Sequence, residues 1–291
     1  MNYRHAFHAG NFADVLKHAV LARILLHLRA KPAPFRVIDT HAGAGLYDLT
    51  GPEAARSGEW RQGIARLLGP SSAPVGAPAR ALLAPYLDAV AALNEGDRLT
   101  TYPGSPALVR GFLRGQDRLT ACELEPNAAA ALARNLRGDR RSKAVAIDGW
   151  TALNAYVPPK ERRGLVLVDP PFEQTDDFPR LAQALEAALR KWTSGSYLLW
   201  YPIKERSAPD ALARRLLRGG MLQGGSGKVL RAELAVSGPR DANRLGACGL
   251  IVVNPPWTLE SELAVLLPEL AAALSGDRRG SHRVDWLGGE K

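Results

Sequence analysis

One segment constrains the fold of this chain more than any other: the uninterrupted apolar run Gly164–Val168, which reads Gly-Leu-Val-Leu-Val. A continuous run of aliphatic and β-branched residues is typical of a central parallel strand that is covered on both faces. Parallel sheets of this kind occur almost only in α/β proteins, in which helices cover the sheet. We therefore predict an α/β fold built on a mostly parallel sheet.

Asp169-Pro170-Pro171-Phe172 follows this strand directly. Ligands of open α/β sheets bind outside the carboxyl ends of the strands, so this motif stands where a site is expected. The Asp169 carboxylate and the Pro170 carbonyl can accept both hydrogens of an exocyclic amine, and Phe172 offers a ring face for stacking on a flat base. A tight turn, with Asp169 capping a helix and Phe172 in the core, explains the motif alone equally well.

A second apolar segment, residues 35–38, ends in Asp39 and is followed by a loop that contains Gly43 and Gly45. Glycine lets the backbone approach a ligand closely. Asp48 stands where a dinucleotide fingerprint has its third glycine, which counts against NAD. An acidic residue before the glycines fits S-adenosylmethionine (SAM), whose sulfonium is cationic and which has no pyrophosphate for a helix N-terminus.

Two more predicted strands end in acids, residues 117–123 at Glu123 and residues 143–147 at Asp148, which Gly149 follows. A carboxylate at the tip of the second strand is where ribose hydroxyls are held in nucleotide-binding α/β folds. Asp148 is placed to meet an adenine amino group. Four acids in register along one sheet edge are hard to explain as solvated strand ends, so we predict a SAM site there.

These motifs resemble, in order, those of class I SAM-dependent amino-methyltransferases. The opening segment, residues 3–18, narrows the resemblance to the RlmJ family, which are bacterial 23S ribosomal RNA adenine-N6 methyltransferases. Four further segments carry it: residues 39–45, 102–106, 199–202 and 254–257. The resemblance runs from near residue 3 to near residue 287. The family commonly has tyrosine at the position of Phe172, so stacking is kept here while a phenolic hydroxyl is lost.

The resemblance implies a Rossmann-like class I methyltransferase fold, with SAM as the cofactor and 23S rRNA, free or in an early precursor, as the partner. The residues expected to bind the cofactor are His18, His41, Gly43, Gly45, Ser105, Glu123, Asp148, Gly149 and Asp169. The expected catalytic residues are Asp169, Pro170 and Phe172, and substrate RNA is expected to contact Phe172 and Tyr3, in an N-terminal tail that closes over the site. Without the resemblance, the basic pair Lys17 and His18 would be assigned to a solvated helix face.

The chain divides into a core and an insertion. The segment between the first two predicted strands is much longer than a usual βα connection and contains helical stretches near residues 58–68 and 78–93. We predict a small helical insertion, residues 47–99, in a methyltransferase core formed by residues 1–46 and 100–291. Further helices are expected over residues 11–29, 127–136, 177–191 and 209–218, and a fifth strand over residues 196–201. Residues 229–236 and 249–253 are expected to pair as a terminal antiparallel hairpin, followed by a short segment at residues 284–287 and a loose end.

Composition sets limits on the partner and the compartment. A net charge of +9 and a pI near 9.8 favour a polyanionic partner. Cys122 and Cys248 lack metal-ligand spacing and fit a reducing cytosol. The sequence has no apolar run approaching the ~20 residues that cross a bilayer. We expect a cytoplasmic monomer that binds neither a metal nor a membrane.

Asn254-Pro255-Pro256-Trp257 is a rival for the catalytic loop, since asparagine can replace aspartate in such motifs. It follows the last predicted core strand rather than the fourth, so we expect it to pack, or to edge the pocket with Trp257. Three other functions stay open at this point. They are a DNA adenine-N6 methyltransferase, a protein-glutamine methyltransferase and a non-catalytic RNA-binding assembly factor.

Overall fold

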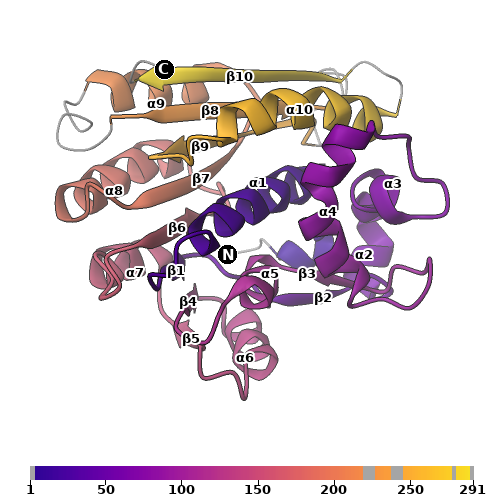
Figure 1. Ribbon diagram of the computed structural model, residues 1–291, viewed down its shortest axis with the longest axis horizontal. Coiled ribbons are helices and arrows are strands. Elements are labelled where there is room, and N and C mark those ends of the chain that lie inside the picture. Colours follow the sequence, from indigo (N-terminus) through magenta and orange to yellow (C-terminus); the bar gives the residue numbers. More distant parts are fainter. Residues whose placement is uncertain (1–3, 219–226, 237–244, 277–279, 289–291) are drawn as a thin grey trace.

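The computed structural model describes residues 4–218, 227–236, 245–276 and 280–288, drawn in colour in Figure 1. Its strands are β1 (Arg36–Asp39), β2 (Leu46–Asp48), β3 (Thr101–Pro103), β4 (Arg118–Glu123), β5 (Ser142–Ala146), β6 (Gly164–Val168), β7 (Ser196–Pro202), β8 (Val229–Ala235), β9 (Ala247–Val253) and β10 (Ser281–Gly288). Its α-helices are α1 (Phe12–Arg29), α2 (Pro52–Ser57), α3 (Ala65–Leu68), α4 (Ala77–Ala91), α5 (Ser105–Phe112), α6 (Pro126–Asn135), α7 (Gly149–Tyr156), α8 (Asp177–Lys191), α9 (Ser207–Arg218) and α10 (Leu259–Ser275). Two 3₁₀ helices, η1 (His5–Phe7) and η2 (Glu59–Gln62), complete the set.

The main sheet has the strand order β10-β8-β9-β7-β6-β1-β4-β5. Strands β5, β4, β1, β6 and β7 are parallel. Strand β6 lies in the interior of the sheet between β1 and β7, and all five of its residues are buried. Helices cover both faces of the sheet, because these strands are apolar on both sides. The predicted α/β fold with a mostly parallel sheet is confirmed.

The antiparallel part of the sheet is larger than predicted. Strands β8 and β9 form the expected antiparallel pair, and β9 is also antiparallel to β7. The hairpin is not terminal, because β10 adds to the free edge of β8 and the unpredicted helix α10 precedes it. The alternation of polar and apolar residues in Ser281–Gly288 fits an edge strand that has one covered face.

Helix α1 begins where the sequence indicates, because the Asn11 side chain accepts hydrogen bonds from the backbone amides of Ala13 and Asp14. In Figure 1 the helix lies in front of the sheet among α4, α5 and α10, with which it is in contact. Fourteen of its 18 residues are therefore buried, Lys17 and His18 among them. A solvated face, the usual interpretation of an isolated basic pair, therefore does not apply to Lys17 and His18, because α4, α5 and α10 pack against the helix.

The segment between β1 and β4 contains a small antiparallel ribbon, in which β2 pairs with β3, and α5 follows β3 before β4 begins. Between these strands lie α2, η2, α3 and α4, so the predicted helical stretches are present while the ribbon and α2 were not foreseen. Side chains such as Leu83 and Tyr86 join the core cluster that also contains α1 and α10. The division into an insertion and a core stays a prediction. Among the described residues, no helix has the length and apolarity that a membrane span requires.

Candidate active site

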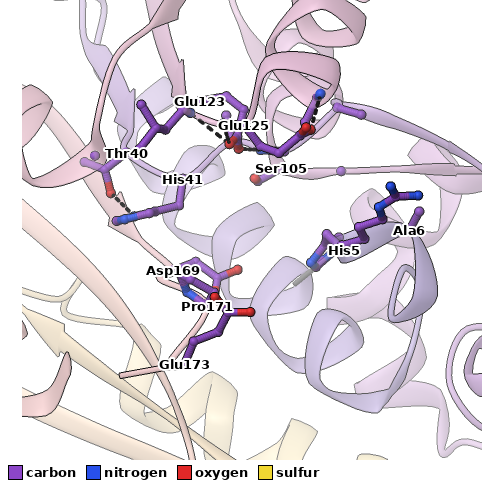
Figure 2. Close-up of a pocket in the computed structure, with 18 of the residues that line it drawn as sticks. His5, Ala6, Thr40, His41, Ser105, Glu123, Glu125, Asp169, Pro171 and Glu173 are labelled. Carbon is purple, nitrogen blue, oxygen red and sulfur yellow. Dashed lines mark hydrogen bonds between the residues drawn. The ribbon is translucent and has the colours of Figure 1, made fainter. Parts of the chain in front are cut away.

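The carboxyl ends of β1, β4, β5 and β6 meet at one edge of the sheet, around a cavity of about 630 Å³. Figure 2 shows Asp169 and Pro171 on one side of this cavity, Glu123 and Glu125 opposite them, and His5 approaching from the N-terminal segment. Cavities that bind small molecules are commonly of this size. Residues from four separate strand ends thus meet in one pocket, as the sequence pattern predicts.

Two glycines of this pocket are required by geometry. Gly43 has a φ of +61°, and a Cβ there would collide with the Tyr47 hydroxyl. A Cβ at Gly149 would collide with the Thr40 carbonyl oxygen and would lie 2.6 Å from ring atoms of His41. A larger residue at either position would push these neighbours apart, so glycine is what lets the loops after β1 and β5 pack closely where they line the cavity.

Glu123 is held by three backbone amides. Its Oε2 accepts from Gly43 N at 2.8 Å, and its Oε1 accepts from Leu124 N and Glu125 N, both at 2.8 Å. A carboxylate has about four acceptor positions, so about one remains, on Oε2. Glu123 is therefore oriented to accept one further hydrogen bond, for example from a ligand hydroxyl.

Asp148 and Glu125 each serve as a helix cap while lining the pocket. Asp148 Oδ2 accepts from the Thr151 backbone amide at 2.8 Å at the start of α7, and Glu125 accepts from Ala128 N at 2.6 Å at the start of α6. The capping role does not exclude a binding role, because Asp148 keeps Oδ1 for another donor.

Asp39 lies beneath the pocket floor and is fully buried. Its Oδ2 accepts a hydrogen bond from Ser105 Oγ at 2.7 Å, while Oδ1 has no partner among the described residues. Burial raises the pKa of Asp39 to about 7, despite the hydrogen bond from Ser105. Ser105 itself lines the cavity, so it links the buried acid to the pocket.

His41 lines the pocket between Thr40 and Trp150. Its Nδ1 lies 2.8 Å from Thr40 Oγ1, and its ring meets the Trp150 ring edge-on at 5.2 Å. Burial lowers the pKa of His41 to about 4, so the ring is neutral near pH 7. A neutral ring at this position adds no positive charge near a cationic ligand.

Asp169 forms an ion pair with a buried lysine. Lys17 Nζ lies 2.5 Å from Asp169 Oδ2 and 2.8 Å from Asp14 Oδ1. Burial alone would lower the pKa of Lys17, but the charges of Asp14 and Asp169 outweigh it, and the pKa lies well above its ordinary value. The ammonium therefore stays charged and fixes the carboxylate of the Asp-Pro-Pro-Phe motif from the side of α1.

Asp14 also connects the N-terminal segment to the pocket. Its Oδ2 lies 3.0 Å from His5 Nε2 and accepts the Gly10 backbone amide at 2.9 Å. Burial would raise the pKa of Asp14, but Lys17 and the neighbouring histidines hold it well below its ordinary value. His5 lines the cavity, so one buried carboxylate positions both His5 and Lys17 there.

Several predicted site residues lie outside the cavity lining. His18 is fully buried behind it, with Nδ1 2.7 Å from the Tyr102 hydroxyl, and burial lowers its pKa to about 3. Gly45, with a φ of +81°, shapes the loop without lining the cavity. Pro170 is buried, while Pro171 lines the cavity. Tyr3 lies outside the described residues.

Phe172 is half-buried in an aromatic cluster rather than in the cavity lining. Its ring centroid lies 4.8 Å from that of Phe178 and 5.8 Å from that of Trp200. Its φ of +50° is unusual for an aromatic residue and turns the backbone sharply after the two prolines. The ring thus packs against Phe178 and Trp200 beside the Asp169-Pro170-Pro171 turn.

The rival motif at Asn254 lies at the opposite edge of the sheet. Strand β9 is antiparallel to β7, and Val253 pairs with Tyr197 near the beginning of β7. Asn254 and Trp257 therefore follow β9 at the amino ends of the parallel strands, and Trp257 is not part of the cavity lining. The expectation that Trp257 edges the pocket is wrong, because an antiparallel strand delivers its carboxyl end to the other side.

Sequence reasoning assigned no site role to several residues found here, among them His5, Asp14, Lys17, Trp150 and Arg180. The spacing of Asp14 and Lys17, which places both on one helix face, was a signal for the ion pair but not for its burial. Arg180 lies over the Trp150 ring at 5.0 Å, a contact between α8 and α7 that no local pattern shows. Among the described residues, no group of three or more His, Cys, Asp or Glu is arranged to hold a metal ion.

Comparisons with known proteins agree with this geometry. The family described as ribosomal RNA large subunit methyltransferase D, RlmJ, matches residues 32–288. Ribosomal RNA large subunit methyltransferase J of Haemophilus influenzae is 38% identical over 288 residues, covering 99% of each chain. The protein of the same name from Escherichia coli is 38% identical over 287 residues, again with 99% of each chain covered.

A crystal structure of a Legionella pneumophila protein superposes with a TM-score of 0.84 at 32% identity, covering 98% of this chain and 99% of that one. The expected Rossmann-like class I methyltransferase fold is confirmed. Because both the family match and the relatives span nearly the whole chain, this protein belongs to the RlmJ family of ribosomal RNA large subunit methyltransferases.

Proposed function

We propose that this enzyme transfers a methyl group from SAM to N6 of an adenine in 23S rRNA. The observation that carries the proposal is the Asp169-Pro170 turn at the carboxyl end of the central strand, facing a pocket lined by the predicted cofactor residues. We further propose that the enzyme acts as a cytoplasmic monomer on free or early-precursor rRNA.

The pocket residues fit SAM. Glu123 would accept a ribose hydroxyl with its remaining acceptor position, and Asp148 would accept the adenine amino group with Oδ1. Gly43 and Gly149 line the cavity without side chains, so a ligand could approach the backbone closely there. His41 and Ser105 would complete the binding site, and buried Asp39 places a second acid below it. When bound, SAM supplies an electrophilic methyl group on a sulfonium.

Asp169 and Pro170 would align the target amine. Lys17 occupies Asp169 Oδ2, which leaves Oδ1 to accept one amine hydrogen while the Pro170 carbonyl accepts the other. Two acceptors fixed in this way favour a pyramidal nitrogen whose lone pair points at the methyl group. The chain thus contributes orientation and electrostatics rather than a covalent intermediate.

The target base has to leave its stack to reach this pocket, at a cost of a few kcal/mol. We propose that Phe172 supports the extruded base and that Tyr3 contacts the RNA from the N-terminal segment. The partial exposure of Phe172 and its place in the turn after Pro171 support its part. The rigid backing of Phe178 and Trp200 would hold the ring in one position.

The test is a map of methylated adenines in total RNA from cells with and without the gene. The proposal predicts one 23S rRNA adenine whose N6 methylation disappears with the gene and returns with the wild-type protein. An unchanged map of 23S rRNA contradicts it. Methylation lost instead from DNA or from a protein glutamine would assign the enzyme to another substrate.

A further inference from the structure

The edge of the sheet opposite the pocket is strongly basic. Here the amino ends of the parallel strands meet: Arg36 pairs with Arg118 on one side and with Gly164 on the other. The loop before β1 joins them, since the Arg114 guanidinium donates to the carbonyls of Arg29 and Lys31. We call the set Arg29, Lys31, Arg114, Arg118, Arg162 and Arg163 the basic edge.

Positive charge is in excess on the basic edge. The acids described there are already paired, Asp117 with Arg114 and Glu161 with Arg36. Arg114 and Arg163 both donate to the Ala33 carbonyl, which brings two guanidinium groups together. Burial and then the nearby charge of Arg114 lower the pKa of Arg163. Like charges held this close favour binding of an anion between or above them.

The pocket edge has the opposite character. Seven carboxylates line the cavity but only three lysine or arginine side chains do, Arg4, Lys17 and Arg180. Lys17 is occupied by its two carboxylates. A polyanionic substrate is therefore poorly attracted at the pocket mouth itself, although the chain carries a net charge of +9. The lysine and arginine side chains that would attract a polyanion therefore lie outside the pocket lining.

The Asn254–Trp257 loop adds an aromatic ring at the same edge. Asn254 Nδ2 donates to the carbonyls of Thr193 and Gly195, and the Asn254 backbone amide donates to Lys228 O, so the loop is rigid. It nevertheless presents Trp257 with 85% of its surface exposed. An exposed aromatic ring next to a hydrogen-bonded turn is a platform on which an unpaired base can stack.

Trp257 and the basic edge lie at the same end of two antiparallel helices. Helix α1 runs toward the amino edge and α10 runs away from it, and the two are joined by the ion pair of Arg23 with Glu262 at 2.8 Å. Arg29 follows Arg23 by less than two turns, and Trp257 precedes Glu262 by a similar length of chain. Arg29 and Trp257 therefore lie on the same side of this ion pair, at the same end of the α1–α10 helix pair.

We propose that the basic edge and Trp257 form a second RNA-binding surface, which holds the phosphate backbone and an unpaired base of the substrate rRNA away from the methylated adenine. This inference rests on the proposed function and adds to it where the rest of the RNA binds. The strands between the two edges are about five residues long, so the surfaces stand about 17 Å apart. Only an RNA longer than the target nucleotide can engage both.

The test compares Arg29→Gln/Lys31→Gln/Arg162→Gln with a control of equal charge loss, Arg61→Gln/Arg98→Gln/Arg214→Gln. All six side chains are exposed. Binding of a 23S rRNA transcript is measured over a series of salt concentrations. The edge variant should lower the slope of log affinity against log salt by about 2 units, since each phosphate contact contributes about 0.7 to 0.9. Its KM for the transcript should rise while kcat is unchanged.

Trp257 is tested separately. Trp257→Ala should weaken transcript binding roughly 5- to 150-fold, the range expected for one stacked base, and Trp257→Phe should keep most of the affinity. Edge and Trp257 variants that bind and methylate the transcript like the control overturn the inference. A wild-type protein that binds the transcript but does not methylate it would contradict the proposed function instead. The binding data would still test the second RNA-binding surface in that case.

Discussion

Lys17 Nζ lies 2.5 Å from Asp169 Oδ2, although 152 positions separate the two residues in the chain. The contact joins the first long helix to the loop after the central strand. Because Lys17 also contacts Asp14, one buried ammonium sits between two carboxylates at the wall of the pocket. Both the stability of this region and the orientation of Asp169 depend on it.

Lys17→Met should abolish most methyl transfer and leave SAM affinity nearly unchanged. Without the ammonium, Asp169 loses its fixed orientation and two buried carboxylates lose their partner, which costs about 3–5 kcal/mol of stability. Transfer is measured with labelled SAM, and stability by urea unfolding. Lys17→Arg keeps the charge, so it should recover more of the stability than of the methyl-transfer activity. A Met variant with full activity would show that the ion pair is only structural.

Glu123→Ala should weaken SAM binding by roughly 1–3 kcal/mol, because a charge-assisted hydrogen bond to the ligand and the anchor of Gly43 are both lost. Glu123→Gln should also lose affinity, since its amide group would point a donor at backbone donors. Calorimetry gives the affinity and circular dichroism verifies folding. Unchanged affinity in a folded variant would remove Glu123 from the cofactor site.

Variants at Phe172 distinguish a stacking role toward the RNA base from a packing role in the protein. Phe172→Tyr should be nearly neutral, because the ring face persists. Phe172→Ala should cost on the order of 1–3 kcal/mol in RNA engagement while SAM affinity stays the same. The measurement is KM for the 23S rRNA transcript beside calorimetry of SAM. If the alanine variant loses stability but keeps its KM, the ring serves only the aromatic cluster with Phe178 and Trp200.

Asp39 makes a pH-dependent contribution to stability. Its pKa is raised from the ordinary value of 3.8 to about 7 in the fold, so the folded state holds a proton that the unfolded state has lost. The stability contribution of the protonated acid is present below about pH 4 and is lost as the pH rises to about 7. Asp39→Asn should therefore gain stability relative to the wild type over this window, by up to about 4 kcal/mol. Parallel pH profiles of urea unfolding for the two proteins would contradict the assignment.

Much of the fold could be predicted because its signals are local. The apolar runs of β1, β4, β5 and β6 and the acid that ends each segment are visible in short windows, as is the Asn11 cap of α1. The parallel order then brings those acids to one edge by geometry alone.

What the sequence hid depends on contacts distant in the chain. The burial of Lys17 results from packing by α4, α5 and α10, so its local pattern resembles a surface pair. Strand β10 is specified by its pairing with β8. The position of Trp257 follows from the antiparallel direction of β9, which places a motif similar to Asp169-Pro-Pro-Phe172 at the wrong edge for catalysis.

The central claim is that Asp169 acts mainly by aligning the target amine and contributes little to the affinity for SAM. The most direct measurement is methyl transfer from labelled SAM to a 23S rRNA transcript by the wild type and by Asp169→Ala, with SAM affinity determined for both. The account predicts N6-methyladenosine as the wild-type product, and a variant that binds SAM with little change but transfers no methyl group. A variant that still forms N6-methyladenosine at the wild-type rate would contradict it.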